Sequence, residues 1–379
     1  MFNGCSSLSS ITWGVDNSNR DNVISIEEGA FAGTAFTEFV FPKNVCDIND
    51  YVFENCTSLT KVSLYGNFND LPLPVEPGDE DEEGEEETEL PCVDHEGNPS
   101  AELMGVQVIK EGAFKGCTSL STINLYDDNY AINPDKDISG HDNVFTFPYS
   151  VTRCDGSSRQ NTNHYTFEGT FPTKVLFSPN MMHVGAYAFH NVTSLTEVKV
   201  EQFEKSKMLT IKASAYQGCT NLETIELPLN LIRIENSAFY GCEKLNNISV
   251  DQLKIVAING GTFYNCQSLE QLKLPETISS IKSDAFYRTY NLNYVVLPES
   301  VTEVLSRAFT ECRQGEVEPM HVYISRTYSA AHAAGKGINF GKNWHDATVK
   351  EYYFLGEGEE RVEGRNYWQL DGSGNPQEI

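Results

Sequence analysis

The chain has 379 residues, of which 40% are apolar and 11% aromatic, and its formal net charge is −27. This is enough apolar material for a packed core, but no stretch approaches the ~18 consecutive apolar residues that a membrane-spanning helix needs. So strong a negative charge repels phosphate groups, which argues against nucleic acid and anionic membranes as partners.

A short unit recurs along the chain from its first residues onward. The runs at residues 236–250 and 260–274 both follow the pattern Phe-x-Gly/Asn-Cys-x-x-Leu-x-x-Ile/Leu-x-Val/Leu. An aromatic residue anchors each unit, and these anchors are Phe2, Phe31, Phe53, Phe114, Phe167, Phe189, Tyr216, Phe239, Phe263, Phe286 and Phe309. Five residues before most anchors lies an isoleucine or valine, at Ile26, Ile48, Ile109, Val184, Ile211, Ile234, Ile258, Ile281 and Val304. The unit at Phe167 departs from this rule, because Thr162 stands in that place, so this unit is either degenerate or preceded by an irregular loop.

The Leu-x-x-Ile-x-Leu part of each unit predicts a short strand with apolar side chains on one face and polar ones on the other. Many of these strands end at a proline, which cannot donate to a strand ladder, as at Pro42, Pro228, Pro275 and Pro298. One such unit cannot bury its apolar face alone, whereas stacked units bury a continuous core. We therefore predict one mainly β, right-handed leucine-rich-repeat solenoid of about eleven repeats over residues 1–325.

The Ala-Phe-x-Gly-Cys-x-x-Leu-x-x-Ile-x-Leu-Pro runs resemble the BspA-like leucine-rich-repeat family of short-period bacterial surface proteins. The resemblance covers roughly residues 1–325 apart from two insertions. It implies a secreted or surface-anchored, adhesin-like protein. No signal peptide is visible at the start, where Met1 to Cys5 already lie within a repeat, so we expect that a leader was removed.

Seven of the ten cysteines share one repeat position, which threonine or valine fills in other units (Thr34, Thr170, Val192 and Thr289). The seven are Cys5, Cys56, Cys117, Cys219, Cys242, Cys266 and Cys312. This exchange indicates a small buried side chain, so we predict reduced thiols rather than disulfides. Cys46, Cys92 and Cys154 lie elsewhere, and the sequence leaves open whether Cys92 and Cys154 pair.

Two insertions interrupt the repeat. The first, at about residues 66–105, contains an acidic run between Glu76 and Glu89, which we interpret as a solvated or disordered loop, with weak calcium binding as the alternative. The second, at about residues 127–164, contains Asp135, Asp137 and Ser139 at alternate positions before a glycine, which is half of a calcium loop. Thr146 stands where that loop needs an acid, so we favour a polar turn over a metal site, and predict no other cofactor.

After Ser325 the repeat fades, and we predict a C-terminal cap or tail over residues 326–379. Its aromatic residues are Trp344, Tyr352, Tyr353, Tyr367 and Trp368. A terminal repeat without a cap exposes an apolar edge, so a cap is the interpretation we prefer to an aromatic ligand site.

The sequence contains no nucleophile elbow, phosphate loop, dinucleotide fingerprint or His-Glu-x-x-His motif, so we predict that the chain is not an enzyme. The outward positions of the predicted strands form a mixed polar surface with tyrosines along it, which favours docking of a ligand. The candidate contact residues are Lys61, Ser63, Tyr65, Thr122, Asn124, Tyr126, Glu197, Lys199, Glu226, Lys273, Tyr294 and Tyr323.

We expect an extracellular or cell-surface solenoid that binds a protein or glycan ligand on host or neighbouring cells. Two alternatives remain at this point. One is a structural spacer within a larger surface protein, and the other is a carbohydrate-binding accessory of a secreted enzyme.

Overall fold

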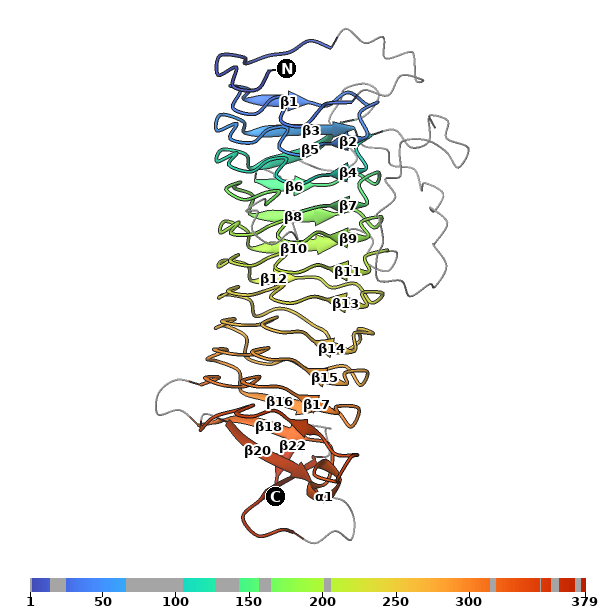
Figure 1. Cartoon of the computed structure of the whole chain (residues 1–379), viewed down its shortest axis with the longest axis vertical. Coiled ribbons are helices and arrows are strands. Elements are labelled where there is room, and N and C mark those ends of the chain that lie inside the picture. Colours follow the sequence, from blue (N-terminus) through green and yellow to red (C-terminus); the bar gives the residue numbers. More distant parts are fainter. Residues whose placement is uncertain are drawn as a thin grey trace, which may run out of the picture.

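The computed structural model of the chain describes residues 2–13, 25–65, 105–126, 143–156, 165–200, 206–313, 318–347, 349–355, 361–371 and 376–379. Short strands stack one below another along the long axis of the molecule and form two rows (Figure 1). Each full turn of the chain is called a coil and is named by its aromatic anchor. Within a coil the chain passes through a strand of the second row, then through a tight turn that holds the anchor, and then through a strand of the first row.

The first row carries the longer strands and consists of two sheets. The upper sheet is parallel and contains, in spatial order, β1 (Glu38–Val40), β3 (Lys61–Tyr65), β5 (Thr122–Tyr126), β6 (Val144–Thr146), β8 (Lys174–Phe177), β10 (Glu197–Val200) and β12 (Thr224–Ile225). The lower sheet contains β16 (Tyr294–Leu297), β18 (Met320–Ile324), β20 (Val349–Phe354), β21 (Asn366–Leu370) and β22 (Pro376–Glu378). Only β22 runs antiparallel to its neighbour among these strands.

The second row is made of two-residue strands, also in two parallel sheets. One contains β2 (Asp47–Ile48), β4 (Val108–Ile109), β7 (Arg153–Cys154), β9 (His183–Val184), β11 (Thr210–Ile211) and β13 (Arg233–Ile234). The other contains β14 (Ala257–Ile258), β15 (Ser280–Ile281), β17 (Glu303–Val304) and β19 (Asn339–Phe340). A single short helix, α1 (Tyr328–Ala331), is present in the described part of the chain.

The aromatic anchors predicted from the sequence stack in order from Phe2 to Phe309. Each ring lies roughly parallel to the next, at centroid separations between 4.8 and 5.8 Å. The isoleucine and valine ladder is buried alongside them. The mainly β leucine-rich-repeat solenoid is thereby confirmed, with its core between the two rows of strands.

The predicted second insertion is not one continuous interruption. Residues 143–156 supply β6 to the first row and β7 to the second. In β7, Cys154 pairs with Ile109 on one side and Val184 on the other, so it occupies the ladder position of this coil. The constant offset from Phe167 points to Thr162, which lies outside the described residues. The unit departs from that offset because extra residues lie between its ladder residue, Cys154, and its anchor.

Cysteine recurs at one position of the repeat because its side chain satisfies a buried backbone carbonyl there. At the shared cysteine position of the repeat, each buried thiol donates to the backbone oxygen of the aromatic anchor in the preceding coil, at S···O distances between 3.0 and 3.2 Å. Thr34, Thr170 and Thr289, which replace cysteine, donate their hydroxyl to the anchor oxygen of their own coil instead, at 2.6 to 2.8 Å. Either residue fills a small site and satisfies a buried carbonyl.

Three cysteines differ from expectation or resolve an open question. Cys5 shares the ladder position in sequence but is exposed, because it belongs to the first described coil and has a neighbouring coil on one side only. Cys154 is a free, buried thiol, so it does not pair with Cys92. Cys46 is disulfide-bonded.

The burial of the ladder thiols predicts their reactivity. Burial raises the pKa of Cys219 and of Cys312 to about 12, and a thiol that is neither ionised nor accessible does not react. The neighbouring Cys117 thiol lowers the pKa of Cys56 to about 7, but the Cys56 side chain is fully buried. We therefore expect a chromogenic disulfide reagent to label Cys5 rapidly in the native protein, and the ladder thiols only after denaturation. The Cys5→Ser variant should lose the rapid phase, and an unchanged rapid phase would contradict the buried ladder.

Both rows of strands are interrupted at the same place, between the coils of Phe239 and Phe263. β13 and β14 belong to different sheets, and no strand pair or bridge joins Asn247 to Gln271 in the first row of this fully described region. These two anchors are 24 residues apart, whereas the anchors on either side are 23 apart. The two coils remain joined by backbone hydrogen bonds in the tight turn, where Phe239 N donates to Thr262 O at 3.1 Å and Gly241 N to Tyr264 O at 2.8 Å, and by the hydrophobic core, which runs through this place without a break.

Strand pairing continues beyond Ser325, where the repeat pattern fades from the sequence. β20 extends the first row and β19 the second, with Tyr353, Tyr367 and Trp344 packed against the main core. The aromatic tail is thus buried in the C-terminal end of the solenoid.

Candidate ligand-binding surface

The outward side chains of the first row form one long surface, called the strand face. It divides into three sections by exposure. Near β5 and β6 the outward Asn124, Val144 and Thr146 are buried. Near β18 to β21 an aromatic cluster closes the surface. Between them lies an open section, called the central strand face, which comprises Glu197, Lys199, Thr224, Glu226, Asn247, Ser249, Gln271 and Lys273.

Charges on the central strand face are paired with one another across and along the strands. Glu197 accepts hydrogen bonds from Lys174 and Lys199, both at 2.8 Å. The bond from Lys174, followed by that from Lys199, holds the pKa of Glu197 below its usual range, and Glu197 in turn raises the pKa of Lys199. Lys273 lies 3.9 Å from Asp251 and is largely exposed. The surface therefore offers fixed charges of both signs, although the chain as a whole is strongly acidic.

Polar side chains between these charges are held by short contacts. The carboxylate of Glu226 accepts from the backbone N–H of Val200 at 3.2 Å, which ties β12 to the end of β10. Asn247 donates to the Thr224 hydroxyl at 3.4 Å, and Ser249 donates to Asp251 at 2.7 Å. These amide and hydroxyl groups can exchange hydrogen bonds with a ligand.

The predicted contact residues fall in all three sections. Lys61, Ser63 and Tyr65 on β3 and Thr122 on β5 are half-buried, and Ser63 donates to the buried Asn124 at 2.6 Å. Tyr126 pairs with Tyr65 in the strand register, but its side chain lies outside the described set. Glu197, Lys199, Glu226 and Lys273 lie together on the central strand face, and Tyr294 lies at its lower border on β16.

Tyr323 is buried, although the alternation of side chains along β18 predicts that it points outward to solvent. It belongs to a second apolar cluster, separate from the main core, with Tyr352 and Trp368 buried beside it and Tyr294 partly buried. Ring centroids lie 5.2 Å apart for Tyr323 and Tyr352, and 5.5 Å apart for Tyr323 and Trp368. Trp368 also donates its Nε1–H to the backbone oxygen of Ile324 at 2.9 Å. Burial raises the pKa of Tyr323 to about 12.

The calcium hypothesis gains no support from the described residues. Asp135, Asp137 and Ser139 lie outside them, and Thr146, at the position where a calcium loop needs an acid, is buried in β6. Within the described part of the chain, no group of three His, Cys, Asp or Glu side chains is placed to hold a metal ion. That part also contains no helix long and apolar enough to cross a membrane.

Sequence reasoning missed a cluster on the tight turns, called the turn clasp. Tyr240, Tyr264 and Tyr287 stack at 4.3 and 4.9 Å, and two ion pairs lie at the Tyr287 end of the stack. Arg307 bonds Asp284 at 2.9 Å and Arg288 bonds Glu311 at 2.8 Å, with both guanidinium groups over the Tyr287 ring.

All four charged residues of the turn clasp have left-handed backbone, with φ between 55° and 63°. In the coil before them Gly261 and Asn265 hold the same two positions. Charged residues stand here at turn positions that prefer glycine or asparagine, and this feature of the sequence could have indicated the cluster.

Stacked aromatic anchors, a buried isoleucine ladder and two rows of parallel strands define this chain as a leucine-rich-repeat solenoid. The chain belongs to the BspA type leucine rich repeat family, whose model matches six copies over residues 1–72, 102–205 and 184–315. No curated protein matches the chain.

Several solved structures are similar to it. A leucine-rich repeat protein of T. pallidum is 26% identical and covers 45% of this chain and 74% of its own, with a TM-score of 0.36. A leucine-rich repeat protein from Bacteroides ovatus is 19% identical, with 88% and 82% coverage and a TM-score of 0.37. The pneumococcal vaccine antigen PcpA is 14% identical, with 87% and 74% coverage and a TM-score of 0.36.

Proposed function

We propose that this chain is a binding protein displayed outside the cell, which holds a protein ligand on its central strand face in the manner of an adhesin. The observation that carries the proposal is the exposure of that section. Its outward side chains remain accessible and oriented by ion pairs, while outward side chains near β5 and β6 and in the aromatic cluster below it are buried. Rigid side chains lose less conformational freedom on binding than mobile ones do.

A glycan is the second candidate ligand. Asn247, Ser249 and Gln271 are exposed side by side on adjacent coils, and their amide and hydroxyl groups match the hydroxyl groups of a neutral sugar chain. A role as a spacer requires no contact on this surface at all.

The test is binding of the chain to an array of extracellular-matrix proteins, mucins and neutral glycans. We expect a saturable protein ligand whose affinity falls at least tenfold, or about 1.4 kcal/mol, in the Lys199→Glu/Lys273→Glu variant. The control is Lys244→Glu/Lys254→Glu, which changes net charge equally at exposed positions away from the strand face. Equal losses in both variants would indicate non-specific charge effects, and silence across the array would leave the spacer function.

A further inference from the structure

The basic and acidic side chains of the central strand face differ in how far they reach into solvent. The exposed fraction of the side chain is 54% for Lys174, which lies beside this surface on β8, 47% for Lys199 and 80% for Lys273. The acids that pair with these lysines are less exposed, at 20% for Glu197 and 25% for Asp251. The ammonium groups therefore form the outer layer of this surface, and the carboxylates form an inner layer.

The carboxylates of the inner layer already have hydrogen-bond donors within the protein. Glu197 accepts from both of its lysines at 2.8 Å. Glu226 accepts from a backbone N–H at 3.2 Å, and Asp251 accepts from the Ser249 hydroxyl at 2.7 Å. A lysine ammonium group has three N–H donors, and its bond to Glu197 uses one of them. A ligand that approaches this surface therefore meets ammonium donors before it meets a carboxylate.

Two of the lysines occupy the same position of the repeat. Lys199 stands ten residues after Phe189, and Lys273 stands ten residues after Phe263, three coils further on. Successive anchors between these coils lie 5.4 to 5.7 Å apart, so the two lysines lie roughly 15 Å apart along the solenoid axis. Residues i and i+4 of an extended peptide face the same way about 13 Å apart, a difference that the lysine side chains can span.

Apolar side chains border the lysines at both ends of the surface. Leu176 is half-buried and stands opposite Lys199 in the strand register, and Val296 is half-buried on the coil after Lys273. These positions suit apolar residues of a peptide. A polyanion, in contrast, carries charge along its whole length and is repelled by the net charge of −27. A few carboxylates among apolar residues match this surface better.

We propose that the ligand of the central strand face is an acidic peptide segment of a protein, extended along the solenoid axis. One carboxylate of the segment binds between Lys174 and Lys199, and another, four residues away, binds Lys273. This inference rests on the proposed function and adds the chemistry of the ligand. Glu197 holds two of the ammonium groups in place before the ligand arrives, so less conformational freedom is lost on binding.

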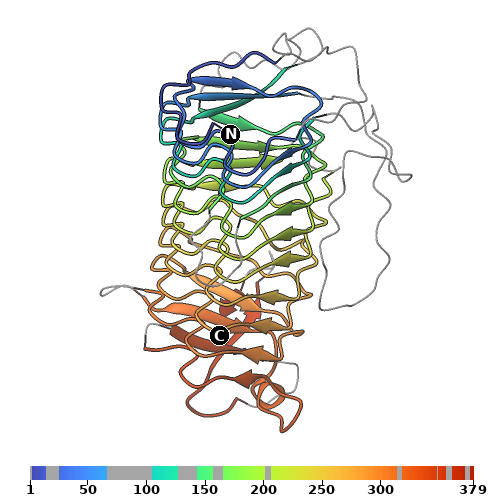
Figure 2. The same ribbon diagram turned by 45° about the horizontal axis from the view of Figure 1, so that its top comes forward.

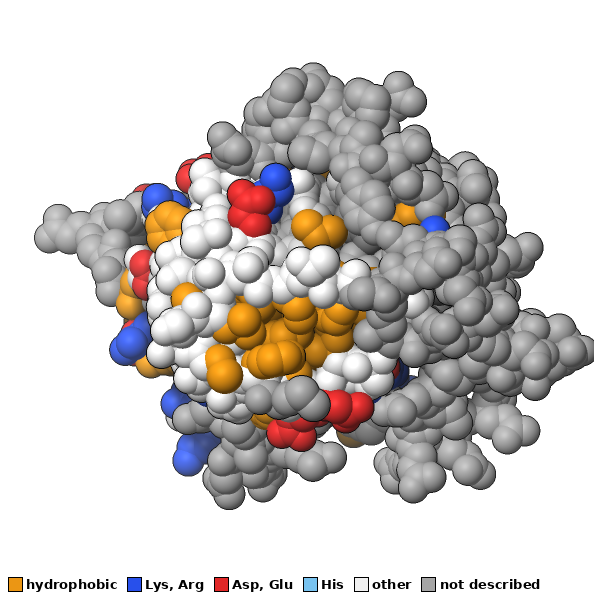
Figure 3. Space-filling view, turned by 90° about the horizontal axis from the view of Figure 1, so that it is seen from above, with side chains coloured by type: hydrophobic (Ala, Val, Ile, Leu, Met, Phe, Trp, Pro, Cys, Tyr) orange, Lys and Arg blue, Asp and Glu red, His pale blue; other side chains and the backbone are white. Residues whose placement is uncertain are grey.

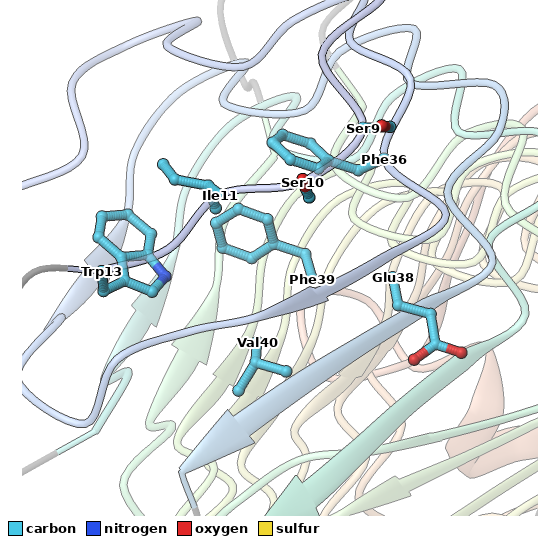
Figure 4. A pocket seen from close by; sticks show the side chains of 8 residues that line it. All are labelled: Ser9, Ser10, Ile11, Trp13, Phe36, Glu38, Phe39 and Val40. Carbon is cyan, nitrogen blue, oxygen red and sulfur yellow. The ribbon is translucent and has the colours of Figure 1, made fainter.

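The N-terminal end of the solenoid offers a different kind of surface, where Figure 3 shows apolar side chains surrounded by polar atoms. A cavity of about 190 Å³ there is lined mainly by apolar residues, and Glu38 is the charged residue in its lining (Figure 4). Trp13 packs over Phe39 edge to face at 6.0 Å, so this cavity belongs to the packing of the first coil. The strands that carry Lys174 and Lys199 lie several coils below this end (Figure 2). An acidic segment is therefore expected on the strand face and not at this end.

Selection from random peptides displayed on phage tests the predicted pattern. We expect the peptides enriched on the chain to carry two acidic residues four positions apart. The Lys199→Glu/Lys273→Glu variant should lose these peptides and enrich peptides with basic residues at the same spacing. The control Lys244→Glu/Lys254→Glu has the same net charge as that variant and should select the same peptides as the unchanged protein.

The most strongly enriched peptide is then measured by itself. Replacement of both its acids by the corresponding amides should weaken binding at least tenfold, because the amide keeps the shape of the side chain but loses the charge that the ammonium groups attract. Binding should also weaken as the salt concentration rises. Selection without acidic enrichment, equal affinity of the amide peptide, or tighter binding of a sulfated glycan than of the peptide would each overturn the proposal.

Two further variants separate this proposal from the proposed function. Asn247→Trp adds bulk at an exposed position of the central strand face without changing its charge, whereas Lys174→Gln/Lys199→Gln/Lys273→Gln removes the outer charges. A ligand from the array that is lost in Asn247→Trp but retained by the lysine variant would leave the proposed function standing and overturn its acidic ligand. A ligand retained by both variants would overturn the two proposals together.

Discussion

Replacement of Phe239 by alanine is expected to lower the free energy of unfolding by about 3–5 kcal/mol. The side chain is fully buried and stacks between Tyr216 and Phe263, at 5.7 Å from each ring. Its coil also borders the place where strand pairing is interrupted in both rows, so packing of the core, including this stack, joins the two halves of the solenoid there in place of strand pairing. We therefore expect denaturant unfolding of this variant to separate into two transitions.

Two controls distinguish these effects. Phe286→Ala removes an equally buried ring from a region where β15 and β17 pair across the coils, so it should cost a similar free energy without separating the transitions. Phe171 is 57% exposed, and its replacement by alanine should change stability by less than about 0.5 kcal/mol. A loss below about 1 kcal/mol for Phe239→Ala would mean that the register of the stacked aromatic anchors is wrong.

Replacement of Trp368 by alanine is expected to open the C-terminal aromatic cluster, at a local cost of about 3–5 kcal/mol. The variant loses the ring contacts to Tyr323 and Phe354 and leaves the Ile324 carbonyl without its indole donor. Because this cluster is separate from the main core, the aromatic ladder should remain folded. Hydrogen exchange should rise in β20 and β21 and stay unchanged near Phe239.

Trp368→Phe serves as the graded control for this prediction. It keeps an aromatic ring but removes the N–H, so we expect the smaller loss of about 1–3 kcal/mol that an unsatisfied buried carbonyl causes. Leu370→Ala, on the same strand but 58% exposed, should have little effect. Faster exchange throughout the solenoid in Trp368→Ala would show that the cluster and the main core unfold together.

The main core could be predicted from the sequence because most coils place the same types of apolar residue at the same positions. The aromatic anchors, the isoleucine ladder and the cysteine position each recur at nearly constant spacing, and their neighbours in space are their counterparts in the next coil. The sequence pattern says less at the places where the spacing changes. Cys154 fills a ladder position ahead of its anchor by an irregular distance, and β19 to β21 continue the stack without the repeat motif.

The exposure of the strand face could be predicted only in part, for a different reason. Alternation along a strand says which side chains point outward, and it placed Glu197, Lys199, Glu226 and Lys273 on the same open surface. It does not say what covers an outward side chain. Tyr323 is outward on β18 and yet buried, because Tyr352 and Trp368 from two later strands pack over it. The turn clasp was missed because its pairs form between coils, 23 residues apart.

The turn clasp also limits how the repeats of this protein can be rearranged. A coil with glycine or asparagine at both left-handed turn positions needs no ion pair with the next coil at those positions. Its duplication or loss therefore leaves no unpaired charge in the neighbouring turns. The coils of Phe286 and Phe309 are different, because Asp284 needs Arg307 and Arg288 needs Glu311. If either coil were moved alone, unpaired charges would remain on strained backbone. We therefore expect deletion of both coils together to leave the remaining turns intact, whereas deletion of either coil alone leaves charged side chains without their partners.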